Sequence, residues 1–318
     1  RDLSKDFSVT IADINKETLT KMEKQFGIKS IHSDLSKPAK IQEIIKSYDL
    51  VVGALPGFLG FQAVKATIEA GKNMVDISFF PEDPFKLDAL AKEKEASVVI
   101  DAGVAPGLSN IILGHGITVL DKTESFSCYV GGLPVERTLP WQYKAPFSPI
   151  DVIEEYTRPA RLKEKGIIVE KEPLSDAEYI NFPQIGTLEA FNTDGLRTVL
   201  KTIDVPNMKE KTLRYPGHIA HIKFLKEVGF FAKDSVRLKT GSVRPIDLSS
   251  KLLIDQWKLN EGEEDLTVMR ILISGEKNNK PTTLQYDLFD KYDREMQVLS
   301  MARTTGFTCT AITRLMSE

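Results

Sequence analysis

Short apolar runs in the first third of the chain end in groups that could hold or act on a small ligand. One run leads into Asp101, Ala102 and Gly103, and another ends at Asp76 with Ser78 just beyond it. A third run is followed by the turn Gly53-Ala54-Leu55-Pro56-Gly57, whose glycines let the backbone come close to a ligand. One such ending would fit an ordinary strand–turn–helix corner, but three similar endings favour a binding crevice.

The runs are predicted to be parallel strands, because β-branched apolar residues without alternation are typical of strands buried on both faces. The carboxyl ends of parallel strands share one edge of a sheet, where open α/β folds bind ligands. Predicted strands alternate with amphipathic helices over residues 7–13, 15–26, 28–32, 38–46, 50–52, 59–70, 73–76, 84–95 and 97–101. This alternation predicts a doubly wound, Rossmann-type parallel sheet within a first domain, residues 1–110.

The start of this domain differs from the usual dinucleotide-binding pattern. Such folds begin with a strand and a G-x-G-x-x-G loop, and no such motif lies near the start of this sequence. A parallel sheet without that strand would leave two interior edges unpaired, so we expect the first strand and the glycine loop to be missing from the sequence as given. A relative that has lost the loop is the alternative.

Asp13 ends the predicted strand 7–13, where an acid binds the ribose 2′-hydroxyl of NAD. Its charge would repel a 2′-phosphate, so we expect NAD as the cofactor. Asp34 follows the next strand, on the adenine side of the expected cofactor. Either acid could instead cap the helix that follows it.

Residues 111–295 have a mixed pattern of strands and helices and are predicted to form a second, α+β domain, followed by a helical return to the first domain over 296–318. Within the second domain we expect, among others, strands over 178–182 and 235–240 and helices over 194–202 and 245–257, and the final helix is expected over about 306–316. Arg158 and Arg161 could grip a carboxylate in two parallel hydrogen bonds, or could lie solvated on a strand. Further polar candidates are Asn192 and Asp194 for an amino group, although Asp194 could instead only cap the helix that follows it. Arg214, Tyr215 and His218 are candidates at a strand-to-helix junction.

The bulk composition narrows the class of protein. The 318 residues are 42% hydrophobic and 27% charged with a net charge of −3, which gives no reason to expect nucleic acid or a membrane as partner. No apolar run approaches the ~18 residues of a membrane span, and no signal-peptide pattern begins the chain. Cys128 and Cys309 match no CxxC spacing, so we expect a reduced, cytoplasmic protein. His218 and His221 have a metal-ligand spacing without a third ligand nearby, so no metal is expected.

Five stretches together resemble the saccharopine dehydrogenase-like family, with the greatest similarity to its L-lysine 6-dehydrogenase branch. They are GALPGFLGF, VDISF, DAGVAPGLSN, EYTRPAR and TLRYPGH, and the resemblance covers nearly the whole chain. It implies an NAD-dependent oxidoreductase that removes the side-chain amine of L-lysine and leaves a semialdehyde, in a homodimer or larger homo-oligomer.

The resemblance also implies roles for the candidate residues. The nicotinamide would reach the Leu55–Pro56 and Asp101–Gly103 turns, and Gly57 and Ser78 would also bind the cofactor. The substrate would lie between the nicotinamide and the second domain. Asp76, Tyr215 or His218 would be the base, and Arg158 or Arg161, with Arg214 or Tyr215, would hold the substrate carboxylate. A saccharopine or carboxynorspermidine-type dehydrogenase, or a binding protein without catalysis, are the alternatives.

Overall fold

The apolar runs near the start of the chain form two small parallel sheets in the computed structural model, which describes residues 1–318. Strand β1 (Thr10–Asp13) pairs with β2 (Lys29–His32), and β3 (Leu50–Gly53), β4 (Asn73–Asp76) and β5 (Val98–Val99) pair in that order. Helix η1 (Leu3–Lys5) precedes these strands, and the helices between them are α1 (Lys16–Phe26), α2 (Pro38–Ile45), α3 (Gly57–Glu69), η2 (Pro84–Leu87) and α4 (Asp88–Glu93). The expected Rossmann-type architecture is confirmed, in two separate pieces of sheet.

Local signals explain where these elements begin and end. Asn15 caps α1 by accepting a hydrogen bond from the Thr18 N–H at 3.0 Å, and Gly27 ends it in a left-handed conformation with φ 65°. The helix expected over 84–95 is divided into η2 and α4. The strand expected over 97–101 has only two residues, because Asp101 takes the left-handed conformation (φ 56°), which a strand cannot continue through.

A larger sheet of eight strands forms the centre of the second part of the chain. Its main order is β15-β14-β6-β11-β10-β9, and β7 pairs with β11 and β8. The strands are β6 (Lys122–Pro134), β7 (Ala160–Glu164), β8 (Ile167–Lys171), β9 (Glu178–Phe182), β10 (Gly186–Asn192), β11 (Asn207–Arg214), β14 (Asp265–Lys277) and β15 (Lys280–Lys291). Strands β6 and β11 run parallel and the other pairs are antiparallel, so this is the mixed α+β architecture that was expected.

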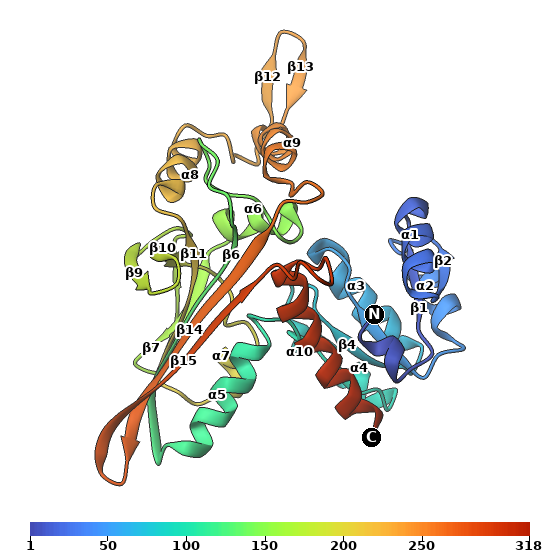
Figure 1. Cartoon of the computed structure of the whole chain (residues 1–318), viewed down its shortest axis with the longest axis horizontal. Helices are drawn as coiled ribbons and strands as arrows, with labels where there is room; N and C mark the ends of the chain where they lie inside the picture. Colours follow the sequence, from blue (N-terminus) through green and yellow to red (C-terminus); the bar gives the residue numbers. More distant parts are fainter. The chain divides into compact units, whose positions relative to one another are not determined.

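The remaining elements of this part are helices and one small hairpin. The helices are α5 (Leu108–Val119), α6 (Pro149–Thr157), α7 (Val199–Thr202), α8 (His218–Glu227) and α9 (Pro245–Trp257), and β12 (Val236–Leu238) and β13 (Gly241–Val243) form a hairpin just before α9 (Figure 1). The helix expected over 194–202 is reduced to one turn, and the strand expected over 235–240 is half of this hairpin. The last helix, α10 (Ser300–Ser317), begins six residues before its expected start at 306.

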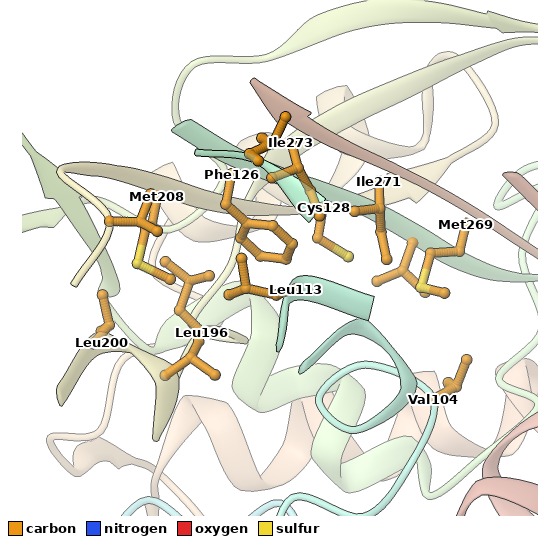
Figure 2. Packing of buried hydrophobic residues seen from close by; sticks show 14 of the residues in the cluster. Val104, Leu113, Phe126, Cys128, Leu196, Leu200, Met208, Met269, Ile271 and Ile273 are labelled. Carbon is orange, nitrogen blue, oxygen red and sulfur yellow. The ribbon is translucent and has the colours of Figure 1, made fainter. Parts of the chain in front are cut away.

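The chain folds into two compact units. Unit 1 contains Arg1–Gly103 and Thr305–Glu318, and unit 2 contains Val104–Thr304. The largest core of unit 2 lies between α5 and the sheet, where Leu113 meets Phe126, Cys128 and Ile271 (Figure 2). Three smaller cores stabilise unit 1, one around Met74 and Phe80, a second around Ile41 and Ala63, and a third around Val75 and Cys309. Each unit therefore buries its own apolar surface.

Candidate active site

The carboxyl end of β4 is held by a fully buried carboxylate. Asp76 is 0% exposed, and its two oxygens accept hydrogen bonds from the Ser78 N–H at 2.8 Å and the Ser78 hydroxyl at 3.0 Å. Two glycines make room for this turn. A Cβ on Gly53 would overlap the Asp76 carboxylate, and one on Gly60 would come within 2.6 Å of the Ser78 Cβ. Asp76 therefore fixes the backbone at the edge where the strand ends meet.

The turn after β5 is tied to the same strand. The Ala102 N–H donates to the Asp76 carbonyl at 3.1 Å, and Ala102 is 0% exposed. Asp101, just before it, is also buried. Within unit 1 the structure thus brings together the predicted residues Asp76, Ser78 and Asp101–Ala102.

The ends of β1 and β2 are more exposed. Asp13 uses one carboxylate oxygen to accept from the Asn15 N–H at 2.7 Å and has no partner at the other, and Asn15 rather than Asp13 is the helix cap. Asp34 accepts from the Ser36 hydroxyl at 2.6 Å and the Ser36 N–H at 3.1 Å, which lower its pKa, and it lies 3.3 Å from Lys37. Asp13 therefore keeps an oxygen that a ribose hydroxyl could reach.

Leu55 and Pro56 are half-buried and Gly57, the first residue of α3, is buried. Pro56 precedes α3 in the N-cap position without a side-chain cap. Pro56 thus offers no side-chain acceptor to the first N–H groups of α3, and the Leu59 N–H donates to the Pro56 carbonyl at 2.9 Å.

Arg214 lies at the centre of a buried network in unit 2. Its side chain is 1% exposed, and it donates to Glu155 at 2.6 Å and to the Tyr156 hydroxyl at 3.0 Å. Its guanidinium also stacks on the Tyr143 ring at 4.3 Å. Burial raises the pKa of Glu155, and the attraction of Arg214 opposes that rise. Arg214 is therefore fully engaged by the protein itself.

The network continues from Tyr156 to His218. The His218 Nδ1 lies 2.9 Å from the Trp141 carbonyl and must donate to it, so Nε2 accepts from the Tyr156 hydroxyl at 2.9 Å. Burial and the charge of Arg214 lower the pKa of His218 to about 3. His218 is thus a neutral, solvent-shielded member of the network at physiological pH.

Tyr215, the neighbour of Arg214, points into a different core. Its hydroxyl donates to the Pro134 carbonyl at 3.0 Å, and the Arg137 guanidinium stacks on its ring at 4.4 Å. Burial raises the pKa of Tyr215. The structure therefore brings Arg214 and His218 together and separates Tyr215 from them.

Arg161 and Asp194 form an ion pair with each other. The guanidinium donates to the two carboxylate oxygens at 2.8 Å and 2.7 Å, and the Asp194 side chain is only 4% exposed. Arg158 lies 3.4 Å from Glu154, and burial lowers the Arg158 pKa. Because the Asp194 carboxylate pairs with Arg161, it does not cap a helix, which was its alternative role. This explains why no helix begins at Asp194.

Asn192 is 1% exposed and uses its amide NH₂ to bind the Ser175 hydroxyl at 3.1 Å and Asp176 at 2.9 Å. Its carbonyl oxygen has no partner. This oxygen is the one acceptor among the predicted substrate residues of unit 2 that is buried and unused.

Sequence reasoning missed Glu155, Tyr156 and Tyr143, which complete the Arg214 network. Glu155 and Tyr156 lie in α6 and are the first two residues of the EYTRPAR stretch, so the available signal was an acid next to an aromatic residue at the start of that stretch. A hollow of about 270 Å³ lies elsewhere in unit 2, lined by Pro134, Val135, Glu136, Thr138, Lys144, Gly262, Glu263 and Glu264. None of the predicted site residues lines it.

No group of three or more His, Cys, Asp or Glu side chains is arranged to hold a metal ion. None of the helices has the length and apolar character needed to cross a membrane.

Two family models together match almost the whole chain. The model described as the saccharopine dehydrogenase NADP binding domain matches residues 1–99, and the saccharopine dehydrogenase C-terminal domain matches residues 103–318. In the mouse, Mus musculus, the mitochondrial alpha-aminoadipic semialdehyde synthase is 25% identical over 252 residues, which are 73% of this chain and 27% of the mouse protein.

A fungal relative and a solved structure agree with these matches. The saccharopine dehydrogenase [NADP(+), L-glutamate-forming] of Pyricularia oryzae is 24% identical over 239 residues, which are 69% of this chain and 53% of the fungal protein. The chain thus spans between about a quarter and a half of the length of these two relatives. The solved apo saccharopine dehydrogenase (L-Glu forming) from Saccharomyces cerevisiae has the same fold, with a TM-score of 0.77 and 17% identity over 97% of this chain and 85% of that one.

Proposed function

The chain belongs to the saccharopine dehydrogenase family, and on this premise we propose that it acts as a nicotinamide-dependent oxidoreductase on the side-chain amine of L-lysine. The cofactor would lie along the carboxyl ends of the parallel strands of unit 1. When bound there, it would supply the acceptor for a hydride from the amine-bearing carbon. Water would then hydrolyse the substrate imine to the semialdehyde and ammonium.

The observation that supports lysine is the state of the arginines in unit 2. Arg161 and Arg214 are each paired with an acid of the protein, Asp194 and Glu155. Lysine has one carboxylate to be held, and saccharopine has three. The third candidate, Arg158, also lies against an acid, Glu154, at 3.4 Å. A site whose candidate guanidinium groups all face acids of the protein suits the substrate with fewer carboxylates.

Saccharopine is the second candidate, and the names of the fungal and yeast relatives favour it. It would require Arg161 to leave Asp194, or other cations to bind its additional carboxylates.

The proposed base differs from the side chains that the sequence offers. Asp76, Tyr215 and His218 are buried and hydrogen-bonded within the protein. We assign them to positioning, so the lysine amine loses its proton to solvent before the hydride leaves. A free lysine ammonium titrates near pH ~10.4, so the rate should rise with pH through the alkaline range.

Asp13 supports NAD rather than NADP as the cofactor. Its unpaired carboxylate oxygen is available to a ribose hydroxyl and would repel a 2′-phosphate. The match to a domain described as NADP-binding makes this a direct question for experiment. Asp13→Ser should lower the preference for NAD over NADP. If the variant keeps the same preference for NAD over NADP, the only role of Asp13 would be its local hydrogen bond with Asn15.

The test of the function is reduction of NAD and NADP with lysine and with saccharopine as substrates, followed by absorbance. Reduction with lysine and release of ammonium are expected. Turnover of saccharopine alone would replace the first candidate by the second. Cofactor binding without turnover of either substrate would identify a binding protein and refute both.

A further inference from the structure

The two units are joined by the chain at only two places. The chain leaves unit 1 between Gly103 and Val104, and it returns between Thr304 and Thr305. The second crossing lies within the continuous helix α10, drawn in red in Figure 1. Any change in the relative orientation of the units must therefore be absorbed by these two segments.

The first turn of α10 is fixed within unit 2. The carboxylate of Asp265, on β14, accepts from the Ser300 N–H at 2.7 Å and from the Met301 N–H at 2.9 Å. The Ser300 hydroxyl donates to Asp290 at 2.8 Å. A buried acid that binds free N–H groups at a helix N-terminus holds that end firmly.

The last turns of α10 are fixed within unit 1. Arg314 is 2.9 Å from Asp2 and 2.7 Å from Asp6, and the Thr310 hydroxyl donates to Asp2 at 2.7 Å. Cys309 packs in a small core with Val75. The helix is thus anchored at both ends, each end in a different unit.

The residues between the anchors are poor helix formers. Thr304 and Thr305 are β-branched, and Gly306 follows them in the helix interior, where glycine is about 1 kcal/mol less favourable than alanine. A Cβ on Gly306 would meet nothing within 4 Å, so packing does not require glycine there. The Thr304 hydroxyl also donates to the Ser300 carbonyl at 3.0 Å, a bond that tends to bend helices.

We propose that Thr304–Gly306 is a hinge through which the two units change their relative orientation. The segment coincides with the crossing point, lies between two anchored ends and contains a glycine without a packing role. Gly103 stands at the other crossing, which gives the motion a second flexible point. Few-residue hinges of this kind carry domain motions in many two-domain proteins.

The test compares Gly306→Ala with a matched control, Gly114→Ala. Gly114 also lies inside a helix, α5, and its added Cβ would also meet nothing within 4 Å, but α5 belongs wholly to unit 2. Each alanine should slow amide hydrogen exchange in its own helix by about fivefold, as roughly 1 kcal/mol implies.

The two variants should differ in their effect on the distance between the units. Spin labels on Lys46→Cys in unit 1 and Glu170→Cys in unit 2 report that distance, since both positions are exposed and the two native cysteines are buried. Gly306→Ala should narrow the distance distribution, Thr305→Gly should broaden it, and Gly114→Ala should leave it unchanged.

A distribution that responds equally to Gly306→Ala and Gly114→Ala would overturn the proposal. So would amides of residues 304–308 that exchange as slowly as the anchored turns of α10. Neither measurement uses catalytic activity, so the outcome is independent of the proposed function.

Discussion

Arg214→Met tests whether Arg214 is a structural group or is available to a ligand. The substitution leaves the Glu155 carboxylate, whose side chain is 17% exposed, and the Tyr156 hydroxyl without their main partner. Removing one member of a buried ion pair costs about 3–5 kcal/mol, because the remaining charge stays buried and uncompensated. We therefore expect the free energy of unfolding of unit 2 to fall by about this amount.

Tryptophan fluorescence during urea unfolding measures this loss directly. The chain has only two tryptophans, Trp141 and Trp257, and their rings lie 6.4 Å and 5.9 Å from the His218 ring within the same cluster. Arg244→Met is the matched control, because Arg244 pairs with Asp247 on the surface and such pairs contribute about 0–1 kcal/mol.

Adding Glu155→Gln to Arg214→Met should recover much of the lost stability, since the uncompensated charge is then removed. A loss below about 1 kcal/mol for Arg214→Met would refute the reasoning, because it would mean that water already solvates the guanidinium. If the Arg214→Met variant stays stable but has a greatly raised KM for lysine, the result would instead indicate that Arg214 binds the substrate carboxylate.

Two further predictions concern His218 and Gly53. In the folded protein the pKa of His218 is lowered to about 3. As the pH falls below ~6.5, the unfolded chain therefore binds a proton at this histidine while the folded protein does not. The free energy of unfolding should decrease by up to about 1.4 kcal/mol per pH unit down to pH 3. His218→Gln should reduce this dependence in urea unfolding at pH 7 and pH 4.5, and an unchanged dependence would show that His218 is accessible to protons. Gly53→Ala should destabilise unit 1 by about 1–3 kcal/mol in thermal unfolding, because its Cβ would overlap the Asp76 carboxylate; a change as small as that of Gly114→Ala would contradict the packing described at β4.

The elements that the sequence predicts best are those with strong local signals. The helix expected over 245–257 occurs as Pro245–Trp257, because an N-terminal proline and a regular apolar face determine it, and the strand expected over 178–182 also occurs as such. The helix expected over 194–202 occurs only as its last turn, Val199–Thr202, because Asp194, its expected cap, pairs with Arg161, 33 positions away. Long-range pairing of this kind has no local signature.

The same limit applies to the candidate site. The sequence identifies the glycine turns and polar strand ends of unit 1, since their spacing is local. It does not show that Arg214 is neutralised by Glu155, 59 positions earlier, or that His218 accepts from Tyr156. Partners for a charged side chain become visible only once the strands and helices are packed.

The ion pair between Asp2 and Arg314 joins positions 312 apart, and all of unit 2 lies within the loop that it closes. During synthesis the strands of unit 1 leave the ribosome first, but the part of α10 that packs with them follows only after the whole of unit 2. Unit 2 contains all of its own strands and can fold as soon as it has emerged. Unit 1 must wait for α10, and until then the surface that α10 will contact stays uncovered. We therefore expect unit 2 to finish folding before unit 1, although the synthesis of unit 1 begins first. Until α10 is made, the uncovered surface of unit 1 is the part that needs protection from aggregation.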